Sequence, residues 1–561
     1  MLPRSQWLRA GWPRGLVLLA LVLPAMIAGA IQLVVHVGWS LSFAGGALVT
    51  IAVAAPFVRA LGGRPLSAAQ EVGAHAILVA VAAFAGALVY NRHFHGLPNY
   101  QNSDGWGGAD GGYHVIFFWD FVKRGHDTYH GFVAMYSLWE ALRRLGSRHL
   151  LVAIDGSLVY ARVVAAVVPC AIAFSVLHRF RGERRAWWAG AAAALVATLA
   201  VQYLVVLPLL NFHTMGGFWA HVFGLVPLFF LWLADALVRP RLVRLAVLCA
   251  GLVLVRYTYA LNLADLCGLF GALLVVEALG ARTSPAWMRA ALAAAAVAAF
   301  IAARHVFILS EPIFAQWGWV LEHDVGAAER GLSLAVVAGA LTMLAWPVRG
   351  AAAHSGIVRA LRFPVLFAAA DLIVLAFVRR LPPTTFYYFN KYDVAALALA
   401  AGALVVVAAF WAALCASQAR LPALAAALVA VAVASAGVVR MHRSLAAFDT
   451  GFREQVFGGP YERSYPWVMP ATLDRIQRTL DDEHKAFGGY KSRHFAMRVT
   501  TNAIFDHGDI GWMHQPHLDD SPGHCIFWDR GASGHDKLPQ RQCASYVQEP
   551  FPTVEVCSAC F

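Results

Sequence analysis

Two aspartates in a glycine-rich stretch are the residues of this sequence best suited to proton transfer. Asp104 and Asp110 lie in NSDGWGGADGGYHV, and the aromatic Tyr113 and His114 follow directly. Glycine-rich turns let a ligand approach the backbone closely, and a carboxylate there can accept a proton from a hydroxyl group. The alternative is that each aspartate only shapes its turn. We take Asp110 as the candidate catalytic base and Asp104 as its competitor, and we expect His114 to be a hydrogen-bonding residue rather than a metal ligand.

Cations inside or beside apolar runs form a second set of candidate functional residues. Ionisable groups at membrane depth are costly and usually functional, so a cation of this kind is a candidate for binding a phosphate. The alternative for any one arginine is a side chain that only extends to the membrane interface. The best candidates have tyrosine neighbours that can also hold a sugar. The set comprises Arg162, Arg256 with Tyr257, Arg304, and Lys391 with Tyr392, and Tyr113 and His114 are further candidates for binding the substrate.

The apolar composition of the chain excludes an ordinary soluble fold. Hydrophobic residues make up 60% and charged residues 14% of the 561 residues, and the mean hydropathy is +0.60. Soluble domains are about a quarter charged. Only helices satisfy the backbone polar groups of apolar runs that span lipid. The sequence therefore predicts an all-α polytopic membrane protein.

We predict about thirteen transmembrane helices from apolar runs near the spanning length of roughly 20 residues. They lie at 15–36, 39–58, 72–90, 153–177, 186–210, 217–237, 242–256, 260–280, 287–309, 332–347, 363–378, 393–415 and 421–440. The first run also resembles a signal peptide, because a basic start and a small-residue AGA at 28–30 accompany it, so its cleavage stays open.

The distribution of arginine predicts the orientation of these spans. The net charge of +12 comes largely from arginines in short loops, such as 178–185 and 238–244, which is the positive-inside pattern of cytoplasmic loops. The sequence contains no basic stripe with interleaved aromatic residues, which is the pattern that would indicate nucleic-acid binding. With the N-terminus in the cytoplasm, an odd number of spans places 441–561 outside a bacterial inner membrane. We therefore predict a transmembrane domain at 1–440, an outside loop at 91–150, and a small outside domain at 441–561 with an α/β fold.

Four cysteines of the outside domain indicate covalent or metal cross-linking. Cys525, Cys543, Cys557 and Cys560 form an even set, which in an oxidising compartment indicates two disulfides with three possible pairings. Zinc is the competitor, because Cys557 and Cys560 have the spacing of metal ligands and histidines are close in sequence. Two disulfides are the favoured prediction.

The first outside loop resembles the catalytic loop of the GT-C glycosyltransferases, which use polyprenyl-phosphate sugars. The likeness rests on Asp110 with Tyr113, an aromatic helix at 113–122 expected to lie on the membrane surface, an amphipathic stretch at 132–145, and the Ala-Arg pair at Arg162. The segment YYFNKY at 387–392 resembles a basic and tyrosine-rich segment of the same enzymes. This loop follows the third predicted span, whereas many family members carry it after the first. Gly111 also stands where several subfamilies have a glutamate.

This resemblance implies transfer of a sugar, with a pentose such as arabinofuranose as one candidate, from a polyprenyl phosphate to an outside acceptor. The acceptor is then a glycan, lipid or protein of the cell envelope, and the membrane lipid is a further partner. A divalent cation (Mg²⁺, Mn²⁺ or Ca²⁺) is the one cofactor left open, with no ligand set assigned. The alternative is a non-enzymatic lipid or glycan transporter, which should show inverted repeats and broken helices.

Overall fold

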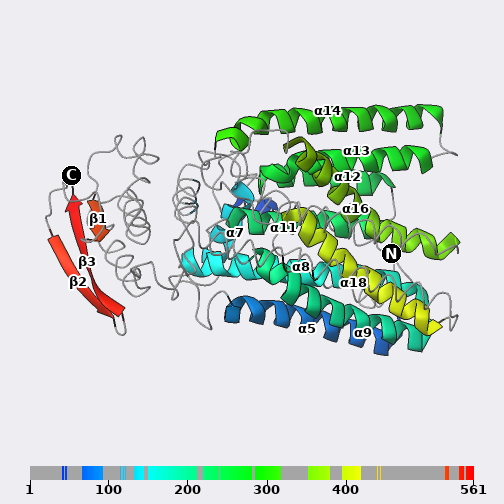
Figure 1. Cartoon of the computed structure of the whole chain (residues 1–561), viewed down its shortest axis with the longest axis horizontal. Coiled ribbons are helices and arrows are strands. Elements are labelled where there is room, and N and C mark those ends of the chain that lie inside the picture. The colour runs from blue at the N-terminus through cyan, green and yellow to red at the C-terminus, as the bar shows by residue number, and fades with distance from the viewer. Residues whose placement is uncertain are drawn as a thin grey trace.

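The computed structural model is a bundle of long helices with a separate three-stranded sheet near the C-terminus (Figure 1). It describes residues 66–92, 132–144, 150–210, 219–238, 241–280, 285–316, 351–378, 394–417, 525–529, 542–548 and 551–560, with single positions at 41–42, 44–46, 48, 114, 118, 121, 439 and 443. The helices are α5 (Ala68–Arg92), α7 (Val133–Leu142), α8 (Leu150–Leu177), α9 (Arg184–Val201), α11 (Trp219–Leu237), α12 (Arg241–Arg256), α13 (Leu263–Gly280), α14 (Ala286–Gln316), α16 (Ala351–Val378) and α18 (Val394–Ser417). Short turns of helix lie at η4 (His178–Phe180), η5 (Gln202–Val206) and η6 (Ala260–Asn262).

Seven of the described helical segments are long and apolar enough to cross a membrane, which confirms a membrane-embedded protein. They are Ala68–Val89, Gly156–Phe180, Arg184–Leu210, Trp219–Leu237, Ala260–Leu279, Ala286–Val306 and Val394–Ser417. The spans predicted at 242–256 and 363–378 coincide with α12 and α16, which are not among the seven. The spans predicted at 15–36, 39–58, 332–347 and 421–440 lie largely or wholly outside the described residues.

Helix α18 forms the centre of the bundle and α14 forms its periphery. In α18, 94% of the apolar window is buried, whereas in α14 only 6% is buried. Small residues allow the central contacts. A Cβ atom on Gly190 of α9 would lie 2.8 Å from the carbonyl oxygen of Ala409 in α18, and one on Gly402 would lie 2.8 Å from Pro169 in α8. Close packing of small residues is a main source of helix association in lipid.

A π-helical turn interrupts the segment that begins as α9, and two side chains of α8 and η5 hold it against its neighbour. Arg162 of α8 is buried, and its Nη1 donates to the carbonyl oxygen of Val206 at 2.9 Å. In return, Nε2 of Gln202 donates to the carbonyl oxygen of Ala165 at 3.2 Å. The π-turn alters the helical bonding near Val206, whose carbonyl Arg162 satisfies. Pro169 in α8 has no N–H, so it leaves the carbonyl of Ala165 without its helical donor, and Gln202 replaces that bond.

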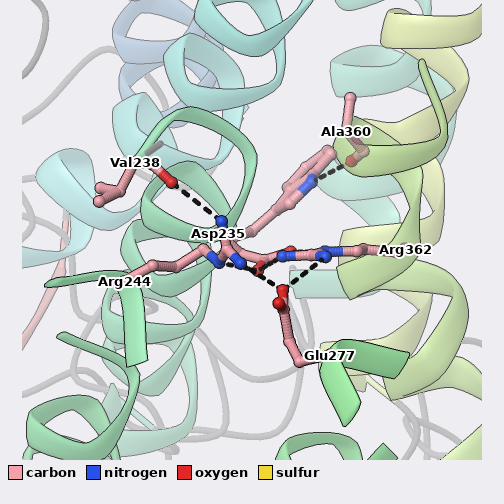
Figure 2. A network of polar contacts seen from close by, with 7 residues as sticks. Asp235, Val238, Arg244, Glu277, Ala360 and Arg362 are labelled. Carbon is pink, nitrogen blue, oxygen red and sulfur yellow. Dashed lines mark hydrogen bonds and ion pairs between the residues drawn. The ribbon is translucent and has the colours of Figure 1, made fainter. Parts of the chain in front are cut away.

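A buried network of four charged side chains joins α11, α12, α13 and α16 (Figure 2). The guanidinium of Arg362 faces both carboxylate oxygens of Asp235, with Nε 2.7 Å from Oδ2 and Nη2 bonded to Oδ1. Its Nη1 also donates to Glu277 at 3.3 Å. Arg244 bonds to Glu277 and donates to the carbonyl oxygen of Val238 at 3.2 Å. Two negative and two positive charges therefore meet across four helices, with Asp235 and Arg244 buried and Glu277 and Arg362 partly buried. A third cation, Arg359 of α16, interacts electrostatically with all four.

Apart from the helical position Arg443, the described residues of 441–561 form a β-sheet. Strands β1 (Cys525–Asp529) and β2 (Gln542–Gln548) flank β3 (Phe551–Cys560), and both pair with it in antiparallel fashion. Strands therefore occur within the region predicted as an α/β domain, and most of that region lies outside the described residues.

Removing one acid from the ionic network should destabilise the bundle strongly. The change Asp235→Ala leaves Arg362 without its bidentate partner, and an uncompensated buried charge typically costs about 3–5 kcal/mol. We expect that loss in the free energy of unfolding, measured by tryptophan fluorescence in detergent micelles. The double change Asp235→Leu with Arg362→Met removes both charges and should recover part of it. The control is Arg185→Ala, at an exposed arginine of α9, and an equal loss there would contradict the assignment.

Candidate functional site

Helix α7 is a short helix buried at the end of the bundle. Its ten residues extend about 15 Å, half the thickness of a bilayer core, so it does not cross the membrane. Every residue from Val133 to Glu140 is buried. The backbone N–H of Ala134 donates to the carbonyl oxygen of Tyr257 at 3.0 Å, and Nε1 of Trp139 donates to Ser157 of α8 at 2.8 Å. The stretch predicted as amphipathic at 132–145 therefore contains a helix, α7, whose residues Val133–Glu140 are buried on all faces.

The aromatic segment before α7 is also buried in protein where it is described. His114, Phe118 and Phe121 are helical and lie 7%, 0% and 0% exposed. Their spacing of four and three residues places them on one helical face, and this face contacts Tyr136 and Trp139 of α7. The sequence predicts that the apolar side of this segment lies in the lipid headgroup region. The structure instead packs the described face against α7, so this prediction is wrong for that face.

His114 is held by one hydrogen bond and a cage of aromatic rings. Its Nδ1 lies 3.1 Å from the hydroxyl oxygen of Tyr136. The edge of its ring meets Phe132 at a centroid distance of 4.9 Å, and its face stacks on Trp219 of α11 at 6.4 Å. A buried imidazole with a hydroxyl partner fits the expected hydrogen-bonding role. No group of three or more potential metal-ligating side chains occurs among the described residues.

A second set of buried polar residues continues from this cage along α11 and into α13. His221 lies two residues after Trp219, and its ring stacks on Tyr259 at a centroid distance of 4.7 Å. Tyr259 precedes η6, which ends at the buried Asn262, and the buried Asp265 lies in the first turn of α13. We call the six residues His114, Tyr136, His221, Tyr259, Asn262 and Asp265 the α7-end cluster; Asn262 and Asp265 are grouped with it because they follow Tyr259 closely in the chain.

Asn262 is the member of the α7-end cluster whose side chain has no hydrogen-bond partner. The residue is 0% exposed, and neither its amide nitrogen nor its amide oxygen is bonded to another described residue. Leaving a buried polar group unsatisfied costs about 1–3 kcal/mol. Such groups in a native structure require an explanation. A primary amide offers both a donor and an acceptor, which is the complement of a sugar hydroxyl.

Arg256 lies beside α7 as an exposed cation. It ends α12, and the next residue, Tyr257, accepts the hydrogen bond from Ala134 that ties α7 to this point. Arg256 is exposed and makes no ion pair with any described residue. The geometry thus brings the predicted pair Arg256 and Tyr257 to the α7-end cluster.

The other predicted site residues have different positions. Arg162 is buried, and its guanidinium donates to the carbonyl oxygen of Val206. The role that this contact supports is structural. Arg304 is exposed on the peripheral α14, where no described contact links it to α7. Asp104, Asp110, Tyr113, Lys391 and Tyr392 lie outside the described residues.

Sequence reasoning missed most of the α7-end cluster. His221, Tyr259, Asn262 and Asp265 were not selected, although each is a polar residue within the apolar runs FWAHVFG and YALNLADLCG. That interruption of an apolar run was the available signal, because buried polar residues in membrane helices are usually functional. Glu140 was missed for the same reason. It is fully buried and bonded to Arg143 at 2.8 Å and Arg144 at 2.5 Å.

Comparison of the chain with protein-family models, with curated proteins and with solved structures finds no match. The assignment of a function therefore depends on the geometry of the α7-end cluster.

A methyl group at Gly224 should disrupt this cluster. The Cβ atom would lie 2.7 Å from Cβ of Tyr259, which cannot rotate away and must shift with its backbone. Overpacking of this kind costs about 1–3 kcal/mol. We expect Gly224→Ala to lower the free energy of unfolding by that amount and to displace the ring stacked on His221. The matched control is Gly356→Ala in α16, where nothing lies within 4 Å. It should be neutral or mildly stabilising, and equal effects of the two changes would contradict the packing described.

Proposed function

We propose that this protein is a glycosyltransferase of the GT-C type, which transfers a sugar from a polyprenyl phosphate to an acceptor outside the cytoplasm. The observation that supports it most is the α7-end cluster. It combines a non-spanning helix, aromatic rings and buried polar groups at one end of the membrane helices. A lipid-linked sugar needs such a place, because its tail must stay in the bilayer while the sugar meets polar side chains.

Asp110 is the proposed catalytic base. It lies four residues before His114, so the length of the chain keeps the two Cα atoms within about 14 Å of each other. His114 contacts Tyr136 of α7, so this short separation in sequence supports the choice of Asp110 as the base. Asp104 lies ten residues before His114 and is less restricted.

The proposed reaction exchanges one bond at the anomeric carbon. Asp110 accepts the proton of the acceptor hydroxyl as the hydroxyl oxygen forms a bond to that carbon. The bond from the carbon to the phosphate oxygen breaks, and the phosphate keeps the electron pair. Arg256 is proposed to stabilise the negative charge that develops on the leaving polyprenyl phosphate, because it is an exposed cation beside α7 without an ion-pair partner among the described residues.

Three further residues and the membrane orientation complete the proposal. Tyr257 is proposed to contact the sugar, and the hydrogen bond of its carbonyl oxygen to Ala134 of α7 supports this role. Lys391 with Tyr392 stays proposed for the same phosphate from sequence alone. We propose a bacterial inner membrane, with the N-terminus inside and 441–561 outside, on the distribution of arginine in the loops.

The direct test is to incubate the purified protein with a panel of polyprenyl-phosphate sugars, pentoses and hexoses, and to measure release of the lipid phosphate. Release with one donor supports the proposal. Absence of release with every donor, combined with movement of a labelled lipid across proteoliposomes, would favour the transporter instead.

Neutralising the proposed base should abolish transfer without unfolding the protein. Asp110→Asn is nearly isosteric and removes only the proton-accepting charge, and loss of a general base costs about 10²–10⁴-fold in rate. We expect that decrease in lipid-phosphate release, with an unchanged melting temperature. Asp104→Asn is the matched control. If Asp104→Asn abolishes release while Asp110→Asn does not, the roles are exchanged, and if neither matters the enzyme proposal fails.

Replacing Asn262 separates a binding role from a structural one. Asn262→Leu preserves volume and removes a buried amide without partners, so the free energy of unfolding should stay constant or rise by about 1–3 kcal/mol. We expect activity to fall in the same variant, because the amide would no longer bond a substrate hydroxyl. The control is Ser175→Ala, whose hydroxyl bonds only within its own helix. Full activity of Asn262→Leu would remove Asn262 from the proposed site.

A further inference from the structure

The register of the C-terminal sheet places the four outside-domain cysteines opposite one another in two pairs. Between β1 and β3, Cys525 is the partner of Cys560. Between β2 and β3, Cys543 is the partner of Cys557. Both pairs lie in regular parts of their ladders, since the irregularity between β2 and β3 lies at Tyr546 and Gln548.

The two pairs occupy opposite faces of the sheet and have the same backbone geometry. Cys557 and Cys560 are three residues apart on β3, and residues alternate between faces along a strand, so one pair belongs to each face. Backbone N–H and C=O groups also alternate between the two neighbouring strands. The pairs Cys543–Cys557 and Cys525–Cys560 are therefore of the same kind. Either both are hydrogen-bonded residue pairs or both are non-hydrogen-bonded pairs. Their Cα atoms are then about 4.5 or 5.5 Å apart, and both values fit a disulfide.

Every other pairing of these cysteines conflicts with the register. A bond from Cys525 to Cys557, or from Cys543 to Cys560, joins opposite faces with an offset of three residues, about 10 Å along the strand. A bond from Cys525 to Cys543 crosses β3, so it spans two strand spacings, about 9.6 Å. Cysteines whose Cα atoms are more than about 7 Å apart cannot be bridged without moving the backbone.

We propose that the domain carries two disulfides, Cys525–Cys560 and Cys543–Cys557, one on each face of the sheet. Each bond forms as two thiols lose two protons and two electrons. A disulfide of a thiol oxidoreductase in the outside compartment accepts them and becomes two thiols. The central strand is then attached covalently to both of its neighbours. This proposal requires an oxidising compartment and does not depend on the glycosyltransferase activity.

The same register argues against zinc. Two thiolates of one structural zinc site each lie about 2.3 Å from the ion. Cys557 and Cys560 occupy opposite faces of one strand, so they cannot reach a common ion while β3 keeps its extended form. The spacing of Cys557 and Cys560 is typical of zinc ligands in a turn. In an extended strand the same spacing puts the two residues on opposite faces.

Paired cysteine-to-serine variants of the full chain test the pairing. Cells that express each variant are treated with a membrane-impermeant maleimide, and labelling is quantified by mass spectrometry of the C-terminal peptides. Cys525→Ser with Cys560→Ser, and Cys543→Ser with Cys557→Ser, should leave the two remaining cysteines unlabelled. The four mismatched double variants should expose both remaining thiols. After prior reduction, the maleimide should label every remaining cysteine of these four in each variant. This control shows that the reagent can reach them.

A second measurement on the wild-type protein guards against a variant that does not fold. Digestion after Lys, Arg and Glu without reduction separates 499–530, 542–555 and 556–561, which hold one, one and two of the cysteines. Fragmentation between Cys557 and Cys560 should find 542–555 attached to Cys557 and 499–530 attached to Cys560. The reverse attachment, free thiols in the untreated protein, or stoichiometric zinc would each overturn the proposal.

Discussion

The arrangement of the bundle depends on the neutral pairing of two acids and two arginines inside it. Asp235, Arg244, Glu277 and Arg362 come from four different helices, and none could stay ionised in an apolar interior alone. Their mutual bonds fix the rotation of α11, α12, α13 and α16 about their axes, because each helix must present one particular residue. Trp232 adds a further link between α11 and α16 by donating to the carbonyl oxygen of Ala360 at 2.7 Å. The α7-end cluster uses two of these same helices, α11 and α13, and Arg256 beside it ends α12. The orientation of His221, Asp265 and Arg256 is therefore set partly by the ionic network.

The helices were predictable from sequence, whereas their polar contacts were not. Apolar runs such as those of α8, α9 and α18 predict helices because a lipid environment leaves no other backbone structure. The network was not predicted, because Asp235 and Arg362 are separated by 127 positions. No periodicity within one helix indicates which distant helix supplies a partner. Each member is nevertheless a charged residue within or beside an apolar run, which marks it as unusual even without its partner.

Burial of α7 shows a second limit of sequence patterns. An aromatic and apolar helix outside a predicted span has two possible apolar partners, lipid or protein, and hydrophobic periodicity does not distinguish them. The sequence marked His114, Arg256 and Tyr257 as candidate binding residues, and the structure places His114 and the backbone of Tyr257 in contact with α7. It did not select Asn262, whose significance comes only from the missing hydrogen-bond partners of its buried amide.

Helix α12 differs from its neighbours in length, and this difference affects the surrounding lipid. Its 16 residues extend about 24 Å, whereas a hydrocarbon core is about 30 Å thick. One face of α12, with Cys249 and Val253, is exposed, and arginines lie at both ends. A bilayer in contact with this face must become thinner or admit the Arg256 side chain below its surface, since both responses relieve hydrophobic mismatch. Where lipid contacts α12, the headgroup region would lie closer to the membrane midplane than around the longer helices. A lipid that diffuses along this flank would bring its phosphate to a greater depth there than elsewhere on the bundle.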